Sequence, residues 1–600
     1  MNLHAIDLGI ILLYLIVVIM IGILIRKKAS QGITNYFLAG KNIPWYVLSV
    51  SNASSMFDIT GTMWLVTILF IYGFKGTLLP WLWPTFNQVF LMIYLARWIR
   101  RSNVLTGAEW IGTRFGNGRG AELSRLSVTI FAIVSVIGFL TYAHQGVGRF
   151  AAGVLPFDLE PDTYALILMS ITTIYVILGG MYSVVFTDVL QFLILTSVSI
   201  IIAVIAMNRI SPDMINAVIP EGWKSLMFGW KLNMDWGNLI PEVNNKIAAD
   251  GYGLFTIVMM MIIFKGILNS MAGTAPNYDM QRVLATRSPK EAAMMSGMVS
   301  VALFPRWLMI AGLTFLGLVF FSDGLRDMGA GIDFEMIMPY IIKSDYIPYG
   351  VTGLIIAGLL AAFMSTFDST VNAGAAYIVN DIYKRYINKE ADDKSIMRMS
   401  YIVSIGIVVL GISFGMLASS IHSVMQWIVS GLGAGFAAPN ILKWHWWRFN
   451  GYGYFWGMVV GIGSALLTAA LFPDMDALYA FPYIIAAAGL VSVIGSLLTE
   501  ADEEDVLVEF YRTVRPWGFW GPVKEKVLKT YPDFVVESSA ARDLLNVFIG
   551  VIWQMTFVLV PILLVMKSFT WMSVAIGIMV VTSIFLKKNW YERLGNDVGN

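Results

Sequence analysis

Hydroxyl and carboxylate side chains lie close together in the middle of a long apolar segment, residues 351–376. Ser365 and Ser369 are spaced to share one face of a helix, and Thr366 and Asp368 flank that face. Hydroxyls, a carboxylate and freed carbonyl oxygens are ligands for a small hard cation. One carboxylate among neutral oxygens suits a monovalent ion better than a divalent one. The structural alternative is that the hydroxyls bond their own helix backbone and Asp368 bonds a neighbouring helix.

A second polar stretch, residues 47–62, lies where a membrane-spanning helix is expected, just before the apolar run 63–74. It is rich in Ser, Asn and Thr and contains Asp58. Because hydrocarbon cannot satisfy loose backbone groups, irregular backbone at that depth survives only where it is buried in protein or lines a cavity. An interrupted polar span with an ionisable residue therefore predicts a binding site.

The same pattern recurs around residues 269–277, where Gly273 and Pro276 interrupt the apolar segment that begins at Leu254. This interruption comes five spans after the first. Two interrupted helices at corresponding places in two five-helix halves are typical of inverted-repeat transporters with a site at the membrane midplane. The alternative is a pair of ordinary kinks or helix ends.

Two glycine-containing segments are weaker signals. Gly179-Gly180 predicts a turn into a helix, with Asp188 just inside its cytoplasmic end, where a carboxylate could receive a cation that leaves inward. Taken alone, Asp188 is explained more simply as a helix N-terminal acid that interacts with the macrodipole. The stretch 431–439 favours tight helix packing over backbone that opens toward a ligand.

The composition indicates a membrane protein with many spans. Of the 600 residues, 57% are hydrophobic and 13% are charged. The net charge of +1 gives no reason to expect a nucleic-acid partner, and no obligate protein partner is evident. The absence of cysteine excludes disulfides and thiolate metal sites, and four histidines without an HExxH motif argue against a metalloenzyme. We therefore expect an all-α polytopic membrane protein that is not an enzyme.

Apolar segments of helix length predict about 14–15 transmembrane helices. The first run is too long for a signal-peptide core and is followed by Arg26-Lys27-Lys28, which places the N-terminus outside. Basic loops and the odd number of spans place the C-terminus in the cytoplasm. The expected spans are roughly 6–25, 46–74, 78–94, 126–147, 164–178, 189–207, 254–271, 298–321, 351–376, 401–417, 424–442, 455–471, 483–498, 544–566 and 571–586.

Several motifs occur in an order that identifies a family resemblance. They are residues 106–116, residues 179–183 followed by Thr187, Asp188 and Gln191, the pair Gln281-Arg282, residues 364–366 and residues 381–383. The chain resembles the sodium:solute symporter family, which includes bacterial sodium/galactose and sodium/proline symporters and the human sodium/glucose transporters. The resemblance covers roughly residues 6–498.

The resemblance implies a LeuT-like fold of two inverted five-helix repeats, with one extra N-terminal helix and extra C-terminal helices. It also implies a multi-pass plasma-membrane protein, with the bacterial inner membrane as the expected location. The implied parts are an N-terminal peripheral helix (1–30), the first repeat (44–210), the second repeat (252–445), peripheral helices (453–498), a cytoplasmic linker (499–543) and C-terminal helices with a tail (544–600). The linker contains Tyr511, Trp517 and Trp520, which indicate a segment at the membrane interface with a short amphipathic helix.

In such a fold a sodium ion is held between the first broken helix and the eighth helix of the repeats. The matching ligands are the carbonyl groups of Ala53, Met56 and Ala362 and the hydroxyls of Ser365 and Thr366.

Some family members carry a second sodium ion. The matching positions here are Asp188, Ser365, Asp368 and Ser369. Asp368 stands where relatives often have a hydroxyl, which should strengthen the site or make it sensitive to protons. The resemblance thus implies two sodium ions per cycle as coupling ions, and no other cofactor.

The solute positions of the family match less well. Asn269 aligns with a sugar-contacting asparagine of the galactose symporter, but Ala272 and Gly273 replace the aromatic pair that follows it there. A buried Arg306, one turn beyond the position of that relative's lysine, would favour a carboxylate-bearing solute. A snorkelling or packing role for Arg306 is the alternative. The expected solute contacts are Asn52, Phe57, Asp58, Trp83, Asn87, Gln88, Asn269 and Gly433, with Trp64 and Trp81 as further stacking candidates.

The expected function is sodium-coupled import of a small polar organic solute by alternating access, with a sugar or sugar acid as the first candidate. The expected partners are that solute, sodium and the lipid bilayer. One alternative is a sodium/amino-acid symporter of the proline type. The other is a proton-coupled symporter of the same fold, in which Asp58, Asp188 and Asp368 relay protons.

Overall fold

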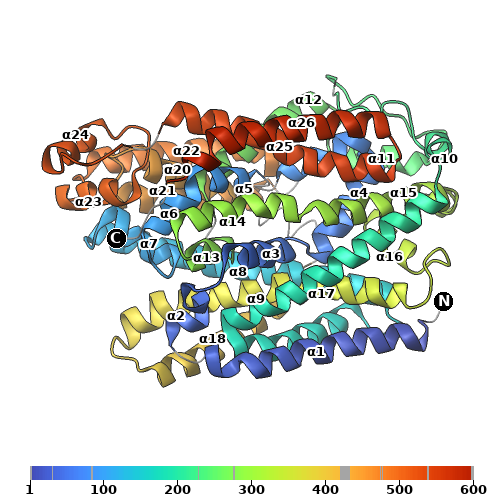
Figure 1. Cartoon of the computed structure of the whole chain (residues 1–600), viewed down its shortest axis with the longest axis horizontal. Helices are drawn as coiled ribbons and strands as arrows, with labels where there is room; N and C mark the ends of the chain where they lie inside the picture. Colours follow the sequence, from blue (N-terminus) through green and yellow to red (C-terminus); the bar gives the residue numbers. More distant parts are fainter. Residues whose placement is uncertain are drawn as a thin grey trace.

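The computed structural model of the chain is a bundle of long helices that lie roughly along one direction (Figure 1). It describes residues 3–29, 32–82, 86–227, 229–274, 278–418, 433–472, 475, 477–536 and 539–595. Among these residues, 11 helical segments are long and apolar enough to cross a membrane, and residues Pro161–Ile177 form a shorter apolar helix. The all-helical polytopic class is therefore confirmed.

The first predicted interruption is present. Helix α3 (Trp45–Ser55) ends at Met56, and α4 (Ile59–Tyr72) begins after a short non-helical link. Asp58 is the N-cap of α4, and its side chain accepts a hydrogen bond from the backbone N–H of Gly61. An aspartate at this position satisfies one of the backbone donors that a helix start leaves open.

The second predicted interruption is also present. Helix α12 (Phe255–Ala272) ends at Gly273, whose φ of 91° is outside the helical range, and α13 (Tyr278–Ala285) resumes beyond it. The predicted link residues 275–277 lie outside the described residues. Two half-helices thus face the interior at corresponding places in the two repeats.

The third predicted span is displaced along the sequence. The expected segment 78–94 contains a short 3-10 turn at Leu79–Leu82, and the continuous helix runs through α5 (Asn87–Phe90), a π-helical turn at Leu91–Leu95 and α6 (Ala96–Arg101). The prediction ended too early because arginines follow Tyr94. Arg100 is buried, however, and its Nε donates to the carbonyl of Thr286 at 2.7 Å.

The predicted turn at Gly180 kinks helix α9 (Pro161–Arg209), where φ is 49° and ψ is −149°. Helix α2 (Ile33–Leu38) packs against this kink. A Cβ atom at Gly180 would lie 2.6 Å from the carbonyl oxygen of Tyr36, and the Tyr36 hydroxyl donates to the carbonyl of Ile177 at 3.0 Å. Only glycine allows both this backbone conformation and this close approach.

Helix α1 (Ala5–Ala29), predicted to be an N-terminal peripheral helix, is hydrogen-bonded to the start of α17 (Val351–Ala376). The carboxylate of Asp7 accepts hydrogen bonds from the backbone N–H groups of Gly350 at 2.8 Å and Gly353 at 2.7 Å. Farther along α1, the Tyr14 hydroxyl accepts from the Gln191 side chain at 3.0 Å. Helix α1 therefore supplies a cap that α17 does not supply for itself.

The glycine stretch before Pro439 packs tightly, as predicted. A Cβ atom on Gly435, the first residue of α20 (Gly435–His445), would lie 2.6 Å from the backbone of Gly461 in α21 (Gly451–Leu471). The first part of the predicted span 424–442 lies outside the described residues.

The two ends of the bundle carry different segments (Figure 1). The N-terminus lies at the end that carries α10 (Pro212–Val218) and α11 (Pro241–Ala249). The segment containing these two helices packs on α4, where the Trp223 indole donates to the Phe70 carbonyl at 2.9 Å and Trp236 stacks on the Phe70 ring. Helices α7 (Gly107–Phe115), α23 (Glu504–Val514) and α24 (Gly521–Thr530) lie at the opposite end.

The linker 499–543 packs on protein. Its aromatic residues were expected at the membrane interface, but Tyr511 and Trp520 are only 3% and 2% exposed. The buried guanidinium of Arg114 lies 5.0 Å from the Trp520 ring centre and 3.2 Å from a carboxylate oxygen of Asp502. A buried arginine needs such partners, and no pattern in the sequence predicted that Arg114 is buried.

The remaining long helices complete the bundle. They are α8 (Arg119–Val154), α14 (Pro289–Ala302), α15 (Phe304–Met328), α18 (Asp393–Leu417), α22 (Ala477–Leu498), α25 (Ala540–Val565) and α26 (Phe569–Asn589), with the short α16 (Ile337–Ile342).

Candidate functional site

The end of α3 meets the middle of α17, and these are the two segments that carry the residues expected to bind the first sodium ion. The Thr366 hydroxyl donates to the carbonyl of Ser55 at 2.6 Å and lies 3.2 Å from the carbonyl of Ala362. At the end of α3, the backbone N–H of Met56 bonds the carbonyl of Ala53 at 3.2 Å. The neighbouring Ser365 hydroxyl is buried and bonded to the Ser55 hydroxyl at 3.2 Å. Neutral oxygens from two helices therefore converge where α3 stops being helical.

The residues expected to bind a second sodium ion are also brought together. Ser365 donates to Oδ1 of Asp188 at 2.5 Å, and the Ser369 hydroxyl lies 3.2 Å from a carboxylate oxygen of Asp368. The other oxygen of Asp368 accepts from the Tyr175 hydroxyl at 2.8 Å. Each of the four expected residues is 1% exposed or less. Asp188 thus belongs to a buried network and is not a helix-terminal acid.

A fifth group, which the sequence did not assign to the site, lies among these side chains. The Arg282 guanidinium on α13 is 1% exposed, and its Nη2 lies 2.9 Å from Asp188. The same nitrogen donates to the hydroxyls of Ser55 and Ser369, each at 2.7 Å. Its Nε donates to the Ser51 hydroxyl at 3.0 Å. One arginine thereby joins α3, α9, α13 and α17.

Asp58 and Arg306 form a loose ion pair beside the first break. Nη2 of Arg306 lies 3.8 Å from Oδ2 of Asp58, and the two side chains are 13% and 24% exposed. The Arg306 guanidinium carbon lies 5.9 Å from the centre of the buried Phe57 ring. The Tyr142 hydroxyl donates to Asp58 at 3.5 Å. Arg306 therefore faces the protein interior and has a carboxylate beside it, so it does not snorkel.

Buried amide side chains form a polar lining near the two breaks. Asn52, Asn87 and Gln88 are 1%, 5% and 3% exposed. Oδ1 of Asn52, Asn87 and Asn269, and both polar atoms of the Gln88 side chain, have no hydrogen-bond partner within the described residues. Such buried groups are costly unless a ligand or water satisfies them.

Other expected solute residues differ in placement. A Cβ atom on Gly433 would lie 3.3 Å from the side-chain nitrogen of Asn269, so these two positions adjoin each other. Trp81 contacts Phe86 edge to face at 4.2 Å between ring centres. Trp83 lies outside the described residues.

Two buried cations of the second broken helix, on α12 and α13, were missed. Arg282 was part of a family motif, but its position was not connected with Asp188. Lys265, within the apolar segment of α12, is 1% exposed, and its Nζ lies 5.9 Å from the Phe481 ring centre. The signal for Lys265 was available, because an ionisable residue within a membrane span is a candidate functional residue by default. Arg282 lies outside every expected span, so this signal did not mark it.

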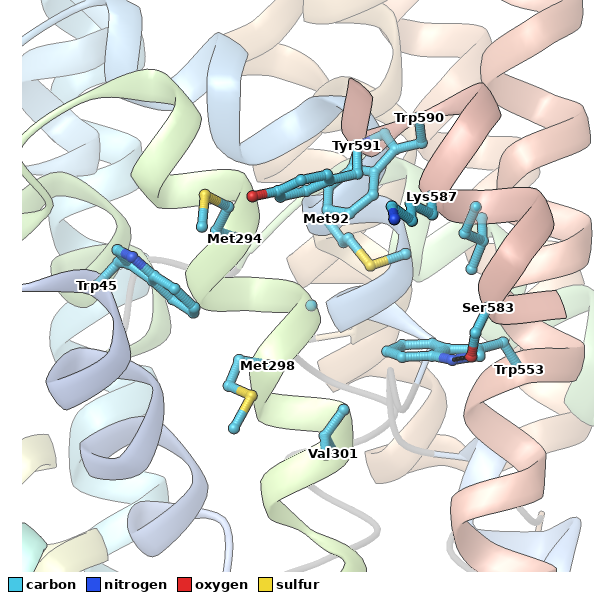
Figure 2. Close-up of a pocket in the computed structure, with 12 residues that line it drawn as sticks. Trp45, Met92, Met294, Met298, Val301, Trp553, Ser583, Lys587, Trp590 and Tyr591 are labelled. Carbon is cyan, nitrogen blue, oxygen red and sulfur yellow. Dashed lines mark hydrogen bonds between the residues drawn. The ribbon is translucent and has the colours of Figure 1, made fainter. Parts of the chain in front are cut away.

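A separate cavity of 260 Å³ lies between α3, α14 and the C-terminal helices α25 and α26 (Figure 2). Trp45 stands on one side, with Trp553 and Lys587 on the other and methionines between them (Figure 2). It contains none of the residues expected to bind sodium or solute. Its apolar lining makes it unsuitable for a polar solute.

The comparisons with known proteins agree with this architecture. A model of the sodium:solute symporter family matches residues 36–461. The chain is 24% identical over 572 residues to a sodium/glucose cotransporter 4 of Danio rerio, covering 84% of this chain and 81% of that protein. It is 25% identical over 551 residues to a sodium/mannose cotransporter of Bos taurus, covering 83% and 87%.

Two further relatives extend this comparison. A sodium/myo-inositol cotransporter of Mus musculus is 24% identical over 578 residues, covering 86% of this chain and 76% of that protein. Among solved structures, the substrate-bound outward-open state of a Na⁺-coupled sialic acid symporter superposes with a TM-score of 0.61 at 18% identity, covering 83% of this chain and 99% of that one. The structural likeness supports the fold.

Proposed function

Because the chain belongs to the sodium:solute symporter family, we propose that this sodium-coupled symporter imports a small polyhydroxylated solute, a sugar or a sugar acid, by alternating access. The observation that carries the proposal is the convergence of α3 and α17 at Thr366 and Ser55, 2.6 Å apart, beside a lining of buried amides.

The first sodium ion is proposed to bind where α3 ends. Its ligands are the carbonyls of Ala53, Met56 and Ala362 and the hydroxyls of Ser365 and Thr366. In support, Thr366 already reaches backbone carbonyls of both helices, at Ser55 and Ala362. A cation there would replace this hydrogen bond and hold the broken helix against α17. Sodium would thus complete the solute pocket and would bind first.

The solute is proposed to bind the amide lining. Asn52, Asn87, Gln88 and Asn269 offer both donors and acceptors, as a polyhydroxylated molecule requires. Phe57 and Trp83 are proposed to flank the solute, and Gly433 leaves space beside Asn269. The relatives named as glucose, mannose and myo-inositol cotransporters support this solute class.

A zwitterionic amino acid is the second candidate, because Asp58 and Arg306 offer one charge of each sign 3.8 Å apart. This pair also weakens the expectation that Arg306 selects a carboxylate. A protein carboxylate already faces Arg306, so the pair suits a neutral sugar as well as an acidic one.

The proposed orientation places the N-terminus outside the cell and the linker 499–543 in the cytoplasm. The two lie at opposite ends of the bundle (Figure 1). The coupling energy is adequate for uptake. One sodium ion contributes about 2.3 kcal/mol per 100 mV of membrane potential and about 1.4 kcal/mol per tenfold gradient.

The test is a thermal-shift screen of purified protein against glucose, mannose, myo-inositol, glucuronate, sialic acid and proline, in sodium and in potassium. The proposal expects a sugar or sugar acid to stabilise the protein in sodium only. Stabilisation by proline alone would favour the zwitterion. Equal stabilisation in both salts would contradict sodium coupling at Thr366 and favour the proton-coupled alternative.

A further inference from the structure

Arg282 occupies the place predicted for the second sodium ion. Its Nη2 lies 2.9 Å from Asp188 and 2.7 Å from the hydroxyl of Ser369, and both residues were expected to be sodium ligands. The guanidinium donates these hydrogen bonds, so it uses oxygen lone pairs that a sodium ion would need. Arg282 and a sodium ion would therefore compete for these oxygens, and their positive charges would repel each other.

The arginine also makes the contact that a bound cation would otherwise make. A sodium ion at this site would hold α9 against α17 through their oxygens. Arg282 does so through Asp188 of α9 and Ser369 of α17, and it also binds Ser51 and Ser55 of α3. Unlike a sodium ion, it is attached to the second broken helix and cannot leave with the solute.

The charges in this hydrogen-bonded cluster favour one free cation. The carboxylates of Asp188 and Asp368 are buried in the cluster, and both oxygens of Asp368 accept hydrogen bonds, from Tyr175 and Ser369. Arg282 balances one of the two carboxylates. One sodium ion at the adjacent first site, which shares Ser365 with the cluster, balances the other. Within this cluster a second sodium ion would exceed the charge of the two carboxylates, and unbalanced charge inside the membrane is costly.

Asp279 lies outside this cluster. It is one turn closer to the break of the second broken helix, and its carboxylate faces Asn52 and Gln88. Its charge acts on Arg282 from that side, but it belongs with the amide lining.

We propose that the guanidinium of Arg282 stands in for the second sodium ion, so that this symporter binds and transports one sodium ion per cycle. The inference rests on the proposed function and replaces the two-ion stoichiometry that the family resemblance implied. It lowers the steepest solute gradient the protein can maintain. At 100 mV and a tenfold sodium gradient, one ion supports about a 500-fold solute gradient and two ions support about a 10⁵-fold gradient.

The decisive measurement is the number of sodium ions bound, and it needs no identified solute. Equilibrium binding of radioactive sodium to the purified full-length protein should saturate at one ion per chain. Arg282→Gln removes the fixed positive charge, so the second site should become free for sodium. The number of sodium ions bound per chain should then rise to two. A count of two for the unaltered protein would overturn the proposal, as would a count of one for Arg282→Gln that retains sodium binding.

Three variants keep the test decisive. Arg282→Lys retains a cation on the same helix and should keep the count at one. Asp368→Asn in the otherwise unaltered chain removes the charge that the single ion balances and should weaken sodium binding at least tenfold. If the site instead holds two sodium ions, Asp368→Asn should remove one of them and leave the other with its affinity. Thr366→Val reports on the first site alone.

The proposed role of Arg282 can be wrong while the proposed function is right, and the sodium count distinguishes the two cases. If the unaltered protein binds no sodium at all, sodium coupling is wrong and the role of Arg282 does not arise. If it binds two ions, sodium coupling stands, and only the proposal that Arg282 takes the place of the second sodium ion is wrong. If Arg282→Gln does not fold, the count for the unaltered protein and the response of Asp368→Asn still decide.

Discussion

The hydroxyl of Thr366 donates a hydrogen bond of 2.6 Å to the main-chain carbonyl of Ser55, the last residue of α3. The two residues are 311 positions apart in the chain, so this contact is a junction between the two repeats. It connects the place where α3 stops being helical to the middle of α17. Any cation bound there replaces this hydrogen bond.

Removal of the Thr366 hydroxyl should weaken sodium binding. Thr366→Val keeps the size of the side chain but deletes a proposed ligand, and a lost hydrogen bond to a charged group costs about 1.5–3 kcal/mol. The sodium concentration for half-maximal stabilisation should therefore rise roughly 10- to 100-fold. The control is Thr370→Val, one turn further along α17, where the hydroxyl bonds only its own helix, at the carbonyl of Thr366. Equal effects of the two variants would contradict a specific role for Thr366.

The balance between Asp58 and Arg306 should set the charge preference of the solute pocket. Asp58→Asn keeps an oxygen to cap α4 but leaves the charge of Arg306 without its nearby carboxylate. The affinity for glucuronate relative to glucose should rise about tenfold, as one charged contact of about 1.4 kcal/mol would give. Competition in the thermal-shift assay measures this ratio. Asp323→Asn, in an exposed pair with Arg326, is the matched control and should leave the ratio unchanged.

The kink in α9 should tolerate only glycine at position 180. Gly180→Ala would place a Cβ atom 2.6 Å from the Tyr36 carbonyl in a backbone conformation that L side chains rarely adopt. The expected loss is about 1–3 kcal/mol of unfolding free energy, seen as a lower thermal midpoint. Gly406→Ala in α18, where a Cβ atom meets open space, should be neutral or slightly stabilising. An unchanged midpoint for Gly180→Ala would show that α2 and α9 can separate there.

The linker contact between Asp502 and Arg114 should make stability depend on pH. Burial raises the pKa of Asp502 to about 6, and the nearby Arg114 charge opposes this rise. Between the unfolded pKa of about 4 and this value, the folded protein holds a proton that the unfolded chain releases. Unfolding free energy from this group should therefore fall as pH rises through 6. Relative to Asp502→Asn, the thermal midpoint of the unaltered protein should rise by about 1 °C from pH 7.5 to pH 5. A difference between the two proteins that does not vary with pH would contradict this assignment.

The sequence predicted both broken helices, because Ser, Asn, Gly and Pro within apolar spans leave a local mark. It also placed Ser365 and Ser369 on one face of α17, since helical spacing is local. It could not place Arg282, which reaches Ser51 across 231 positions of chain. Contacts of that kind depend on how half-helices lie against one another, and no local pattern records this.

The same limit explains the errors at the edges of the site. Arg100 was assigned to a loop because its charge is typical of one. In the structure, backbone carbonyls in the connection between α13 and α14 accept hydrogen bonds from its guanidinium. The sequence did not identify partners for Asp58. Its hydrogen bond from the N–H of Gly61 and its contact with Arg306 both depend on the turn after α3. Trp520 was placed at the membrane interface, because the burial of Arg114 beneath it could not be inferred.

The cap that Asp7 provides for α17 has a consequence for the order of events during synthesis. Asp7 is synthesised 343 positions before its partner Gly350. Helix α1 therefore lacks this contact while the intervening residues are synthesised. The helix that carries Ser365 and Thr366 receives its cap only when the two ends of this interval meet, so assembly of the ion site is a late step, and chains stalled earlier should be unable to hold sodium.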